Sequence, residues 1–428
     1  MSHQPPNNPP ETPDPSPTSS APRKINPPKV ISSFRHRNYR LWFAGQLVSL
    51  VGTWMQIIAQ GWLVYQISHS EFDLGLVGFA AAIPSLIISP WGGVATDRIP
   101  RRTLLVLTQT ALMVMAFILA LLSFANVVQV WHIIVLAALQ GVVNAFDAPA
   151  RLTFVFDMVG REDINNAIAL NSTMFNGARI IGPALGGVLL GFIGARWCFL
   201  INGFSFLAVI AGLLLMTFPA RELHPSKQNP FRQMLEGLQY VRGRRDILAL
   251  LVLSLAFGFS GIAYSSQLPA FVDKVLHSSE ASYGALNAAT GVGAFAAGVL
   301  LAQLAAASPR GRMVTISAFV YPLFLLAFAF NTSLNLALIL IFALGFFWLL
   351  LFNNINSLLQ LNTSEEMRGR VMSLYSLVFF GFSPFGSLLI GAVAERIPLN
   401  LTIALSGVIT LALTIVIFLF APELKKLS

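Results

Sequence analysis

Residues 74–102 read LGLVGFAAAIPSLIISPWGGVATDRIPRR. The first part of this stretch, Leu74–Thr96, carries no charged side chain and is long enough to cross a bilayer core as a helix, which takes about 20 residues. Asp97, Arg98, Arg101 and Arg102 follow at once. Arginines beside the end of an apolar helix hold that end on the cytoplasmic side of a membrane. The stretch therefore predicts a transmembrane helix followed by a charged cytoplasmic turn.

The same alternation of apolar stretches and short polar segments continues along the chain. Of its 428 residues, 55% are hydrophobic and 11% are charged, whereas soluble proteins carry about 25% charged residues. This composition excludes a soluble, disordered or disulfide-stapled chain, and we predict an all-α membrane protein with twelve transmembrane helices. The predicted helices are Leu41–Ile67, Leu74–Thr96, Leu104–Phe124, Val130–Phe154, Ile164–Ile193, Trp197–Phe218, Ile247–Phe271, Ser282–Ala307, Val314–Phe330, Leu334–Leu358, Val371–Val393 and Leu399–Phe420.

The basic residues predict the orientation of these helices. With the N-terminus in the cytoplasm, 23 of the 27 Lys and Arg residues lie on the cytoplasmic side, three lie outside and one, Arg179, lies within a helix. Such an asymmetry is the pattern that orients membrane helices, and it predicts that both termini are cytoplasmic. The net charge of +9 therefore reflects topology, and we expect no nucleic-acid partner.

The polar segments divide the chain into domains. We predict a disordered, proline-rich cytoplasmic tail (1–30), a six-helix bundle (31–218), a cytoplasmic linker (219–246), a second six-helix bundle (247–421) and a short cytoplasmic tail (422–428). The linker is interpreted either as an amphipathic helix on the inner membrane face or as a solvated segment with one short helix. The two bundles echo each other weakly, since Pro183 and Pro384 occupy corresponding helices. Parallel six-helix repeats with a substrate path between them occur in secondary transporters.

The charged turn after Thr96 carries a family resemblance. Gly93 is followed four residues later by Asp97, then by Arg98 and the pair Arg101 and Arg102. This arrangement resembles the loop signature of the major facilitator superfamily, although a proline stands where the pattern usually has a glycine. An acidic side chain at the inner mouth can accept hydrogen bonds from a helix N-terminus of the other half, while arginines pair with nearby carboxylates. We expect a cytoplasmic gate here; the alternative is that the arginines only set topology.

Asp147 is the second acidic residue assigned to this gate. It lies four residues before Arg151, where an i,i+4 pair would help to neutralise it. We expect Asp147 also to face the arginines of the charged turn. Proton carriage by Asp147 is a secondary possibility, because a shallow acid paired with arginine stays ionised.

The fifth predicted helix contains Gly182, Pro183, Gly186 and Gly187. These residues are similar to the antiporter motif of drug-exporting members of the superfamily, with Ala178 at its first glycine position. Small residues let helices approach closely, and proline frees backbone for a bend. Ordinary close packing is the alternative. The resemblance implies export by antiport.

Finer similarity points to a bacterial subgroup. Residues 34–42, 52–56 and 166–179 look like the corresponding segments of enterobactin exporters, and in the second half the likeness rests mainly on 368–371 and 384–386. Membership implies efflux of small organic molecules through a bacterial inner membrane.

Polar side chains within the predicted helices are candidates for a substrate cavity, because intramembrane charges and amides are costly unless they have a role. Arg179 either lines the cavity and meets an anionic or catecholate-like substrate, or binds backbone carbonyls beside Pro183. For the amides, interhelical hydrogen bonding is the alternative role. The amide candidates are Gln56, Gln60, Asn144, Asn171, Asn176 and Asn353.

The sequence contains no catalytic or metal-binding motif and no phosphate-binding loop of an ATPase. We therefore expect neither an enzyme nor a cofactor, and energy must come from a gradient. The prediction is a monomeric, multi-pass secondary transporter that exports a small amphiphilic molecule, siderophore- or drug-like, by alternating access in exchange for protons, surrounded by membrane lipids. A lipid or lysophospholipid flippase is the nearer alternative, and a non-transporting membrane scaffold or sensor the more distant one.

Overall fold

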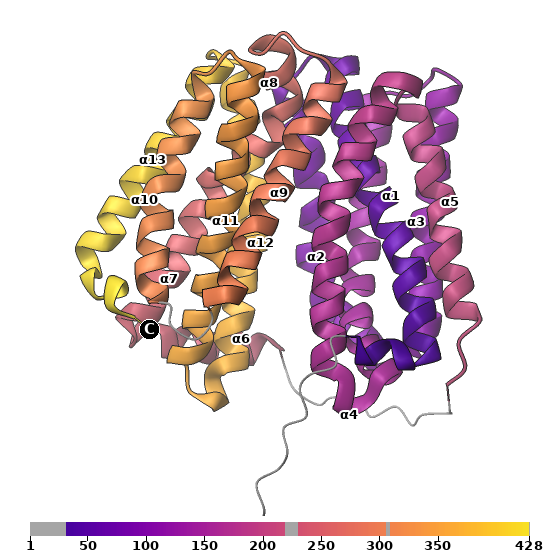
Figure 1. Cartoon of the computed structure of the whole chain (residues 1–428), viewed down its shortest axis with the longest axis horizontal. Helices are drawn as coiled ribbons and strands as arrows, with labels where there is room; N and C mark the ends of the chain where they lie inside the picture. The colour runs from indigo at the N-terminus through magenta and orange to yellow at the C-terminus, as the bar shows by residue number, and fades with distance from the viewer. Residues whose placement is uncertain (1–30, 219–229, 305–308, 428) are drawn as a thin grey trace, which may run out of the picture.

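The computed structural model describes residues 31–218, 230–304 and 309–427. All regular structure in these residues is helical, and Figure 1 shows it arranged as two helical bundles. Eleven helices are long and apolar enough to cross a membrane, judged by length and composition over the described residues. The predicted disordered tail, 1–30, and residues 219–229 of the predicted linker lie outside these ranges.

The first half of the molecule, residues 31–218, begins with a short 3-10 turn and continues with long helices. Its elements are η1 Ser32–Arg35, α1 Arg37–Ser68, α2 Glu71–Arg98, α3 Arg101–Phe124, α4 Val130–Ile193 and α5 Ala195–Leu214. Local capping explains where some of them start. The Ser70 side chain accepts a hydrogen bond from the backbone N–H of Asp73 at the first turn of α2, satisfying one of the donors that a helix start leaves unpaired.

Helix α4 joins two stretches that the sequence predicts as separate helices. It has 64 residues and a single non-helical residue, Gly160, with φ 67° and ψ −168°. This backbone conformation suits glycine, which has no Cβ to clash. Gln140 before the break and Pro183 after it line one cavity, although a straight helix would hold them about 65 Å apart at 1.5 Å per residue. The two arms of α4 therefore fold back on each other at Gly160.

The second half, residues 245–427, follows α6 Pro230–Arg242, a helix in the segment predicted as the linker. Leu235 and Leu238 of α6 are exposed, whereas Val241 is buried. The remaining elements are α7 Arg245–Ala256, η2 Phe257–Gly261, η3 Ala263–Gln267, α8 Leu268–Lys274, α9 Glu280–Leu304, α10 Arg310–Ala329, α11 Leu334–Asn362, α12 Glu365–Ala394, α13 Leu399–Phe420 and η4 Pro422–Lys426.

The first membrane segment of the second half is broken, although its sequence predicts one continuous helix over Ile247–Phe271. A π-helical turn and a 3-10 turn separate α7 from α8. Partners on other helices bind the carbonyls in the broken region: the Tyr321 hydroxyl donates to Gly261 O at 2.8 Å, and the Ser406 hydroxyl donates to Ser260 O. Irregular backbone at membrane depth is stable only where the protein supplies such partners.

Burial is inverted relative to a water-soluble protein. Phe192 and Phe420 are 84% and 81% exposed, while Gln46, Asp147 and Thr410 are 2% exposed or less. Apolar side chains facing outward match an acyl-chain environment, and buried polar groups hold neighbouring helices together by hydrogen bonds.

The two halves meet through α2 against α12 and through α4 against α9. At the second of these contacts the backbones touch: a Cβ added to Gly187 would lie 2.4 Å from the Gly284 Cα. Only glycine on both helices allows so close an approach. The cavity described below lies between the halves, beside this contact.

Candidate functional site

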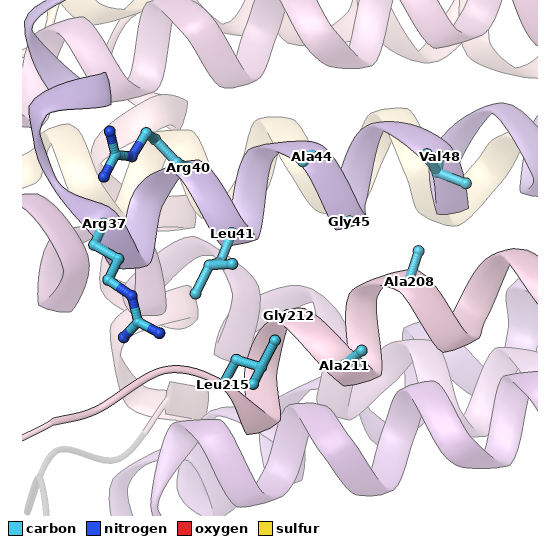
Figure 2. Close-up of a pocket in the computed structure, with 10 residues that line it drawn as sticks. All are labelled: Arg37, Arg40, Leu41, Ala44, Gly45, Val48, Ala208, Ala211, Gly212 and Leu215. Carbon is cyan, nitrogen blue, oxygen red and sulfur yellow. The ribbon is translucent and has the colours of Figure 1, made fainter.

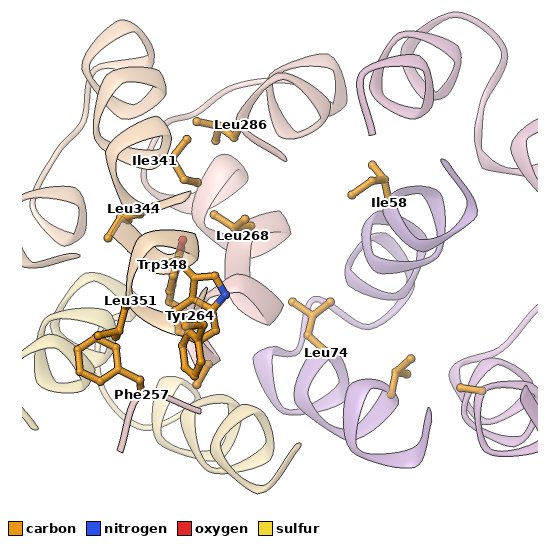
Figure 3. Close-up of a cluster of buried hydrophobic side chains, with 14 of the residues drawn as sticks. Ile58, Leu74, Phe257, Tyr264, Leu268, Leu286, Ile341, Leu344, Trp348 and Leu351 are labelled. Carbon is orange, nitrogen blue, oxygen red and sulfur yellow. The ribbon is translucent and has the colours of Figure 1, made fainter. Parts of the chain in front are cut away.

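A central cavity of about 610 Å³ receives side chains from ten elements. The first half contributes α1 to α5, and the second half contributes η3, α8, α9, α10 and α11. Figure 3 shows this meeting of the halves, with Ile58 and Leu74 facing Leu268, Tyr264 and Trp348. Apolar walls with scattered polar groups are typical of sites that bind small organic ligands.

Arg179 is one of two α4 arginines that line the cavity; the other, Arg151, is paired with Asp147. The Arg179 guanidinium lies 5.8 Å from the centroid of the Trp54 ring, which itself packs edge-on against Phe175 at 5.8 Å. Tyr264 from the opposite half lines the same cavity. Within the described part of the chain, the Arg179 side chain forms no hydrogen bond or ion pair. This geometry favours the cavity-facing role over the binding of carbonyls beside Pro183.

Three tyrosines of the second half complete the wall opposite Arg179. Tyr264 packs edge-on against Phe328 with ring centroids 5.9 Å apart, and the Tyr321 hydroxyl donates to Gly261 O at 2.8 Å. Tyr283 stacks on Trp62 of α1, with ring centroids 5.8 Å apart. The sequence prediction missed these residues; their signal was a phenolic hydroxyl inside an apolar stretch, where a tyrosine needs a hydrogen-bond partner.

Three of the six predicted amides line the cavity: Gln56, Gln60 and Asn144. Gln56 also accepts a hydrogen bond at 2.7 Å from the Nδ2 of Asn202 on α5, so it acts partly as an interhelical clamp. Five amides outside the predicted set also line the cavity: Gln46, Gln109, Gln140, Asn202 and Asn287.

The other three predicted amides do not line this cavity. Asn171 accepts a hydrogen bond from the Tyr39 hydroxyl at 3.2 Å, and Asn176 donates to Ser172 O at 2.9 Å. Asn353 is exposed away from the cavity. Helical spacing does not indicate which neighbour a given face will meet, and that explains the error.

Asp147 is fully buried and bound by three donors. Thr108 Oγ1 and Gln109 Nε2 each donate to it at 2.8 Å, and Arg151 pairs with its second oxygen. The pair with Arg151 is the one that the i,i+4 spacing indicates. The expectation that Asp147 also faces the arginines of the charged turn is wrong, because its remaining partners come from α3.

Two of those arginines bind elsewhere in the first half. Arg101 donates from Nη1 to both carboxylate oxygens of Asp157, at 2.9 and 2.8 Å, and Arg102 donates to Leu213 O and Leu214 O at 2.6 and 2.7 Å. A cation at the C-terminal end of α5 interacts favourably with the negative end of the helix dipole. Arg98 is exposed, a Cβ on Gly93 would meet nothing within 4 Å, and the side chain of Asp97 lies outside the described residues.

The glycines of the antiporter-like motif are packing surfaces. A Cβ on Gly182 would lie 2.4 Å from Trp54 Cβ, and one on Gly186 would lie 3.2 Å from Met55 Cα. Gly187 faces Gly284 across the halves, and Pro183 lines the cavity. The motif thus holds the second arm of α4 between α1 and α9.

Polar contacts between the halves gather at the end that carries the α1–α2 turn. Lys274 pairs with Glu71 at 2.5 Å, Tyr65 donates to Asp273 at 3.0 Å, and Ser70 donates to Glu395 at 2.5 Å. We call these contacts the α1–α2 latch. At the opposite end of α2, Arg101 and Arg102 of the charged turn pair within their own half.

Known proteins resemble the chain over almost its whole length. The staphyloferrin A transporter of Staphylococcus aureus is 25% identical over 391 residues, covering 90% of this chain and 97% of that protein. The multidrug efflux pump Tap of Mycolicibacterium fortuitum is 25% identical, covering 89% and 95%. The enterobactin exporter EntS of Citrobacter koseri is 23% identical, covering 91% and 93%.

The fold also matches solved transporters. A bacterial homologue of the human lysosomal transporter Spinster, in an inward-facing and unoccupied conformation, superposes with a TM-score of 0.68 at 15% identity, covering 92% of this chain and 98% of that one. The transmembrane secretion effector family matches residues 29–427. The chain therefore belongs to the transmembrane secretion effector family of the major facilitator superfamily, and it is a membrane transporter and not an enzyme.

Proposed function

We propose that this protein is a secondary active exporter that moves a small amphiphilic molecule, siderophore- or drug-like, by alternating access in exchange for protons. The observation that carries the proposal is the central cavity, whose walls come from both halves. A rocking motion of the halves would expose such a cavity to each side of the membrane in turn. The relatives that transport siderophores or drugs support this class of substrate.

The cavity favours a substrate that combines an anionic or phenolate group with an aromatic or apolar body. Arg179 offers a guanidinium without an ion-pair partner in the described residues, and Trp54 and Trp348 offer ring faces. The amides on α1 and α4 supply hydrogen bonds that orient the substrate without adding charge.

The conformation described here is proposed to be open to the cytoplasm. The α1–α2 latch joins the halves at one end, while Arg101 and Arg102 at the other end bind their own half. The distribution of basic residues supports a cytoplasmic position for the charged turn. In the opposite conformation, Asp97 would accept hydrogen bonds from the second half and close the cytoplasmic gate together with Arg98 and Gly93.

We further propose twelve membrane crossings, with both termini in the cytoplasm of a bacterium and the chain in its inner membrane. The eleven candidate spans become twelve when the arms of α4 on either side of Gly160 are counted separately. Because one chain supplies every wall of the cavity, a monomer is sufficient for transport.

Proton exchange is assigned to the network around Asp147. This carboxylate is fully buried, and two of its donors, Gln109 and Arg151, line the cavity. A conformation that draws Arg151 away from Asp147 would leave the carboxylate with two neutral donors, which favours its protonation. Restoring the pair with Arg151 would release the proton, so the two conformations of the transporter would differ in their affinity for it.

Transport by purified protein in proteoliposomes under an imposed pH gradient tests the proposal. Staphyloferrin A, enterobactin, a hydrophobic cationic dye and a fluorescent lysophospholipid serve as probes. We expect gradient-dependent flux of at least one of the first three. Flux of the lysophospholipid alone would indicate a flippase, and no flux of any probe would contradict a transport role for this cavity.

A variant pair tests the cavity itself. Arg179→Gln should weaken transport of the anionic siderophores about tenfold or more, since a charge-assisted contact in a dry site contributes about 1.5–3 kcal/mol. Arg196 is the matched control, because its guanidinium also lies over an aromatic ring, 5.4 Å from Phe124, but outside the cavity. Equal loss in Arg179→Gln and Arg196→Gln would refute the assigned role of Arg179.

A further inference from the structure

A second hollow, separate from the central cavity, opens on the outside of the first half between α1 and α5. It encloses about 590 Å³, and Figure 2 shows its lining side chains along the two helices. The walls and floor are apolar and small, and are formed by Leu41, Ala44, Gly45, Val48, Ala208, Ala211, Gly212 and Leu215. No lining residue is shared with the central cavity. We call this hollow the α1–α5 groove.

Close approach of the two helices explains the floor of the groove. A Cβ on Gly45 would lie 2.7 Å from Ala208 O, and one on Gly212 would lie 2.9 Å from Leu41 O. The helices therefore touch through backbone, and the side chains beside the contact are too short to fill the surface. Val48 and Leu215 are 50% and 57% exposed, so the groove opens to the acyl chains of the surrounding bilayer.

Two arginines stand at one end of the groove. Arg37 and Arg40 lie in the first turn of α1, three residues apart and thus on neighbouring positions of the helix surface. Both are exposed, and within the described residues neither has an ion pair. The adjacent Arg35, by contrast, pairs with Glu162 and Asp163 at 3.0 and 2.8 Å.

The expected depth of the arginines and of the groove in the membrane also suits one ligand. The arginines occupy the helix end that the basic-residue distribution places at the cytoplasmic surface. From Leu41 to Val48 the groove runs about 10 Å along α1 toward the membrane centre, at 1.5 Å per residue. A ligand with an anionic head at the surface and an apolar chain directed inward matches both features.

We propose that the α1–α5 groove is a binding site for an anionic phospholipid of the cytoplasmic leaflet. Arg37 and Arg40 bind its phosphate, and one acyl chain lies over Ala44 and Ala211. The bound lipid stabilises the packing of α1 against α5 in the first half. Because the site is separate from the substrate cavity, the lipid binds whether or not the protein is transporting.

Native mass spectrometry of the detergent-purified full chain tests the site. The probes are phosphatidylglycerol and, as the zwitterionic comparison, phosphatidylcholine. We expect the wild-type protein to retain phosphatidylglycerol preferentially, and Arg37→Gln/Arg40→Gln to bind it roughly 30-fold more weakly, as expected when two cations near an anionic surface are removed. Arg161→Gln/Arg312→Gln, which removes two exposed arginines outside the groove, should retain wild-type binding.

A second variant separates the groove from the charge. Ala44→Phe/Ala211→Phe fills the groove and keeps both arginines, and the exposed position of both alanines limits damage to the fold. We expect it to lose selective retention of phosphatidylglycerol while its thermal unfolding in phosphatidylcholine stays close to wild type. Equal retention of the two lipids by the wild type, or unchanged phosphatidylglycerol binding in both double variants, would overturn the proposal.

Discussion

Replacing Gly187 with alanine should drive the protein out of the conformation described here. The added Cβ would lie 2.4 Å from the Gly284 Cα on α9, whereas carbon atoms in ordinary contact lie about 3.5–4.0 Å apart. The second arm of α4 and α9 must therefore separate by about 1 Å or more, and they belong to different halves. Overpacking of this kind costs about 1–3 kcal/mol.

The cost falls on one conformation only, because a rocking motion changes the approach of α4 to α9. The gain in helix propensity from glycine to alanine acts on both conformations alike and cancels in their ratio. A shift of 1–3 kcal/mol changes the ratio of conformations by about 5- to 150-fold. We expect the α1–α2 latch to open in most molecules and transport to slow.

Distances between spin labels measure this shift directly. Cysteines replace the exposed residues His69 and Arg396, which flank the α1–α2 latch, in a background that carries Cys198→Ala. Gly191→Ala is the matched control, since its Cβ would meet Glu280 Cγ at an ordinary 3.6 Å one turn further along α4. A Gly187→Ala distance distribution identical to those of the wild type and the control would refute the reasoning.

Three further substitutions test individual contacts. Asp147→Asn leaves Arg151 without its carboxylate and should lower the free energy of unfolding by about 1–3 kcal/mol. The loss is smaller than for a fully buried pair because the Arg151 side chain is 29% exposed. Thermal unfolding measures the loss, and adding Arg151→Gln to the variant should restore the stability. Glu71→Gln removes the ion pair with Lys274 and should populate the open form of the α1–α2 latch, seen with the same spin labels. Tyr321→Phe removes a hydrogen bond worth about 0.5–1.5 kcal/mol from the broken segment after α7 and should speed amide exchange there.

Local properties of the chain predicted a large part of the fold. Apolar length identified the membrane segments, and charge asymmetry predicted their orientation, because the bilayer acts on each segment through its own composition. One error came from contacts with distant residues. The helix over Ile247–Phe271 is broken, and hydroxyls on α10 and α13 bind its carbonyls. The two helices predicted over Val130–Phe154 and Ile164–Ile193 correspond to the two arms of α4, which meet at Gly160.

The candidate site was predictable only in part. Arg179 stood out because an arginine within an apolar stretch is costly, and it does line the cavity. The sequence did not indicate Tyr264, because its position in the cavity depends on a helix break that distant residues stabilise. Asn171 was assigned to the cavity, yet Tyr39, 132 positions away in sequence, binds it.

The sequence by itself determined that this chain is a membrane protein, how its apolar segments are spaced and where its intramembrane charges lie. These properties follow from the free energies of transfer of consecutive residues from water to the bilayer. Only the tertiary structure decided which polar groups face each other. A buried amide or carboxylate takes whichever donor the packing brings to it, as Thr108 and Gln109 reach Asp147 from another helix. That choice is made by contacts between segments far apart in the chain, and periodicity along one helix contains no information about them.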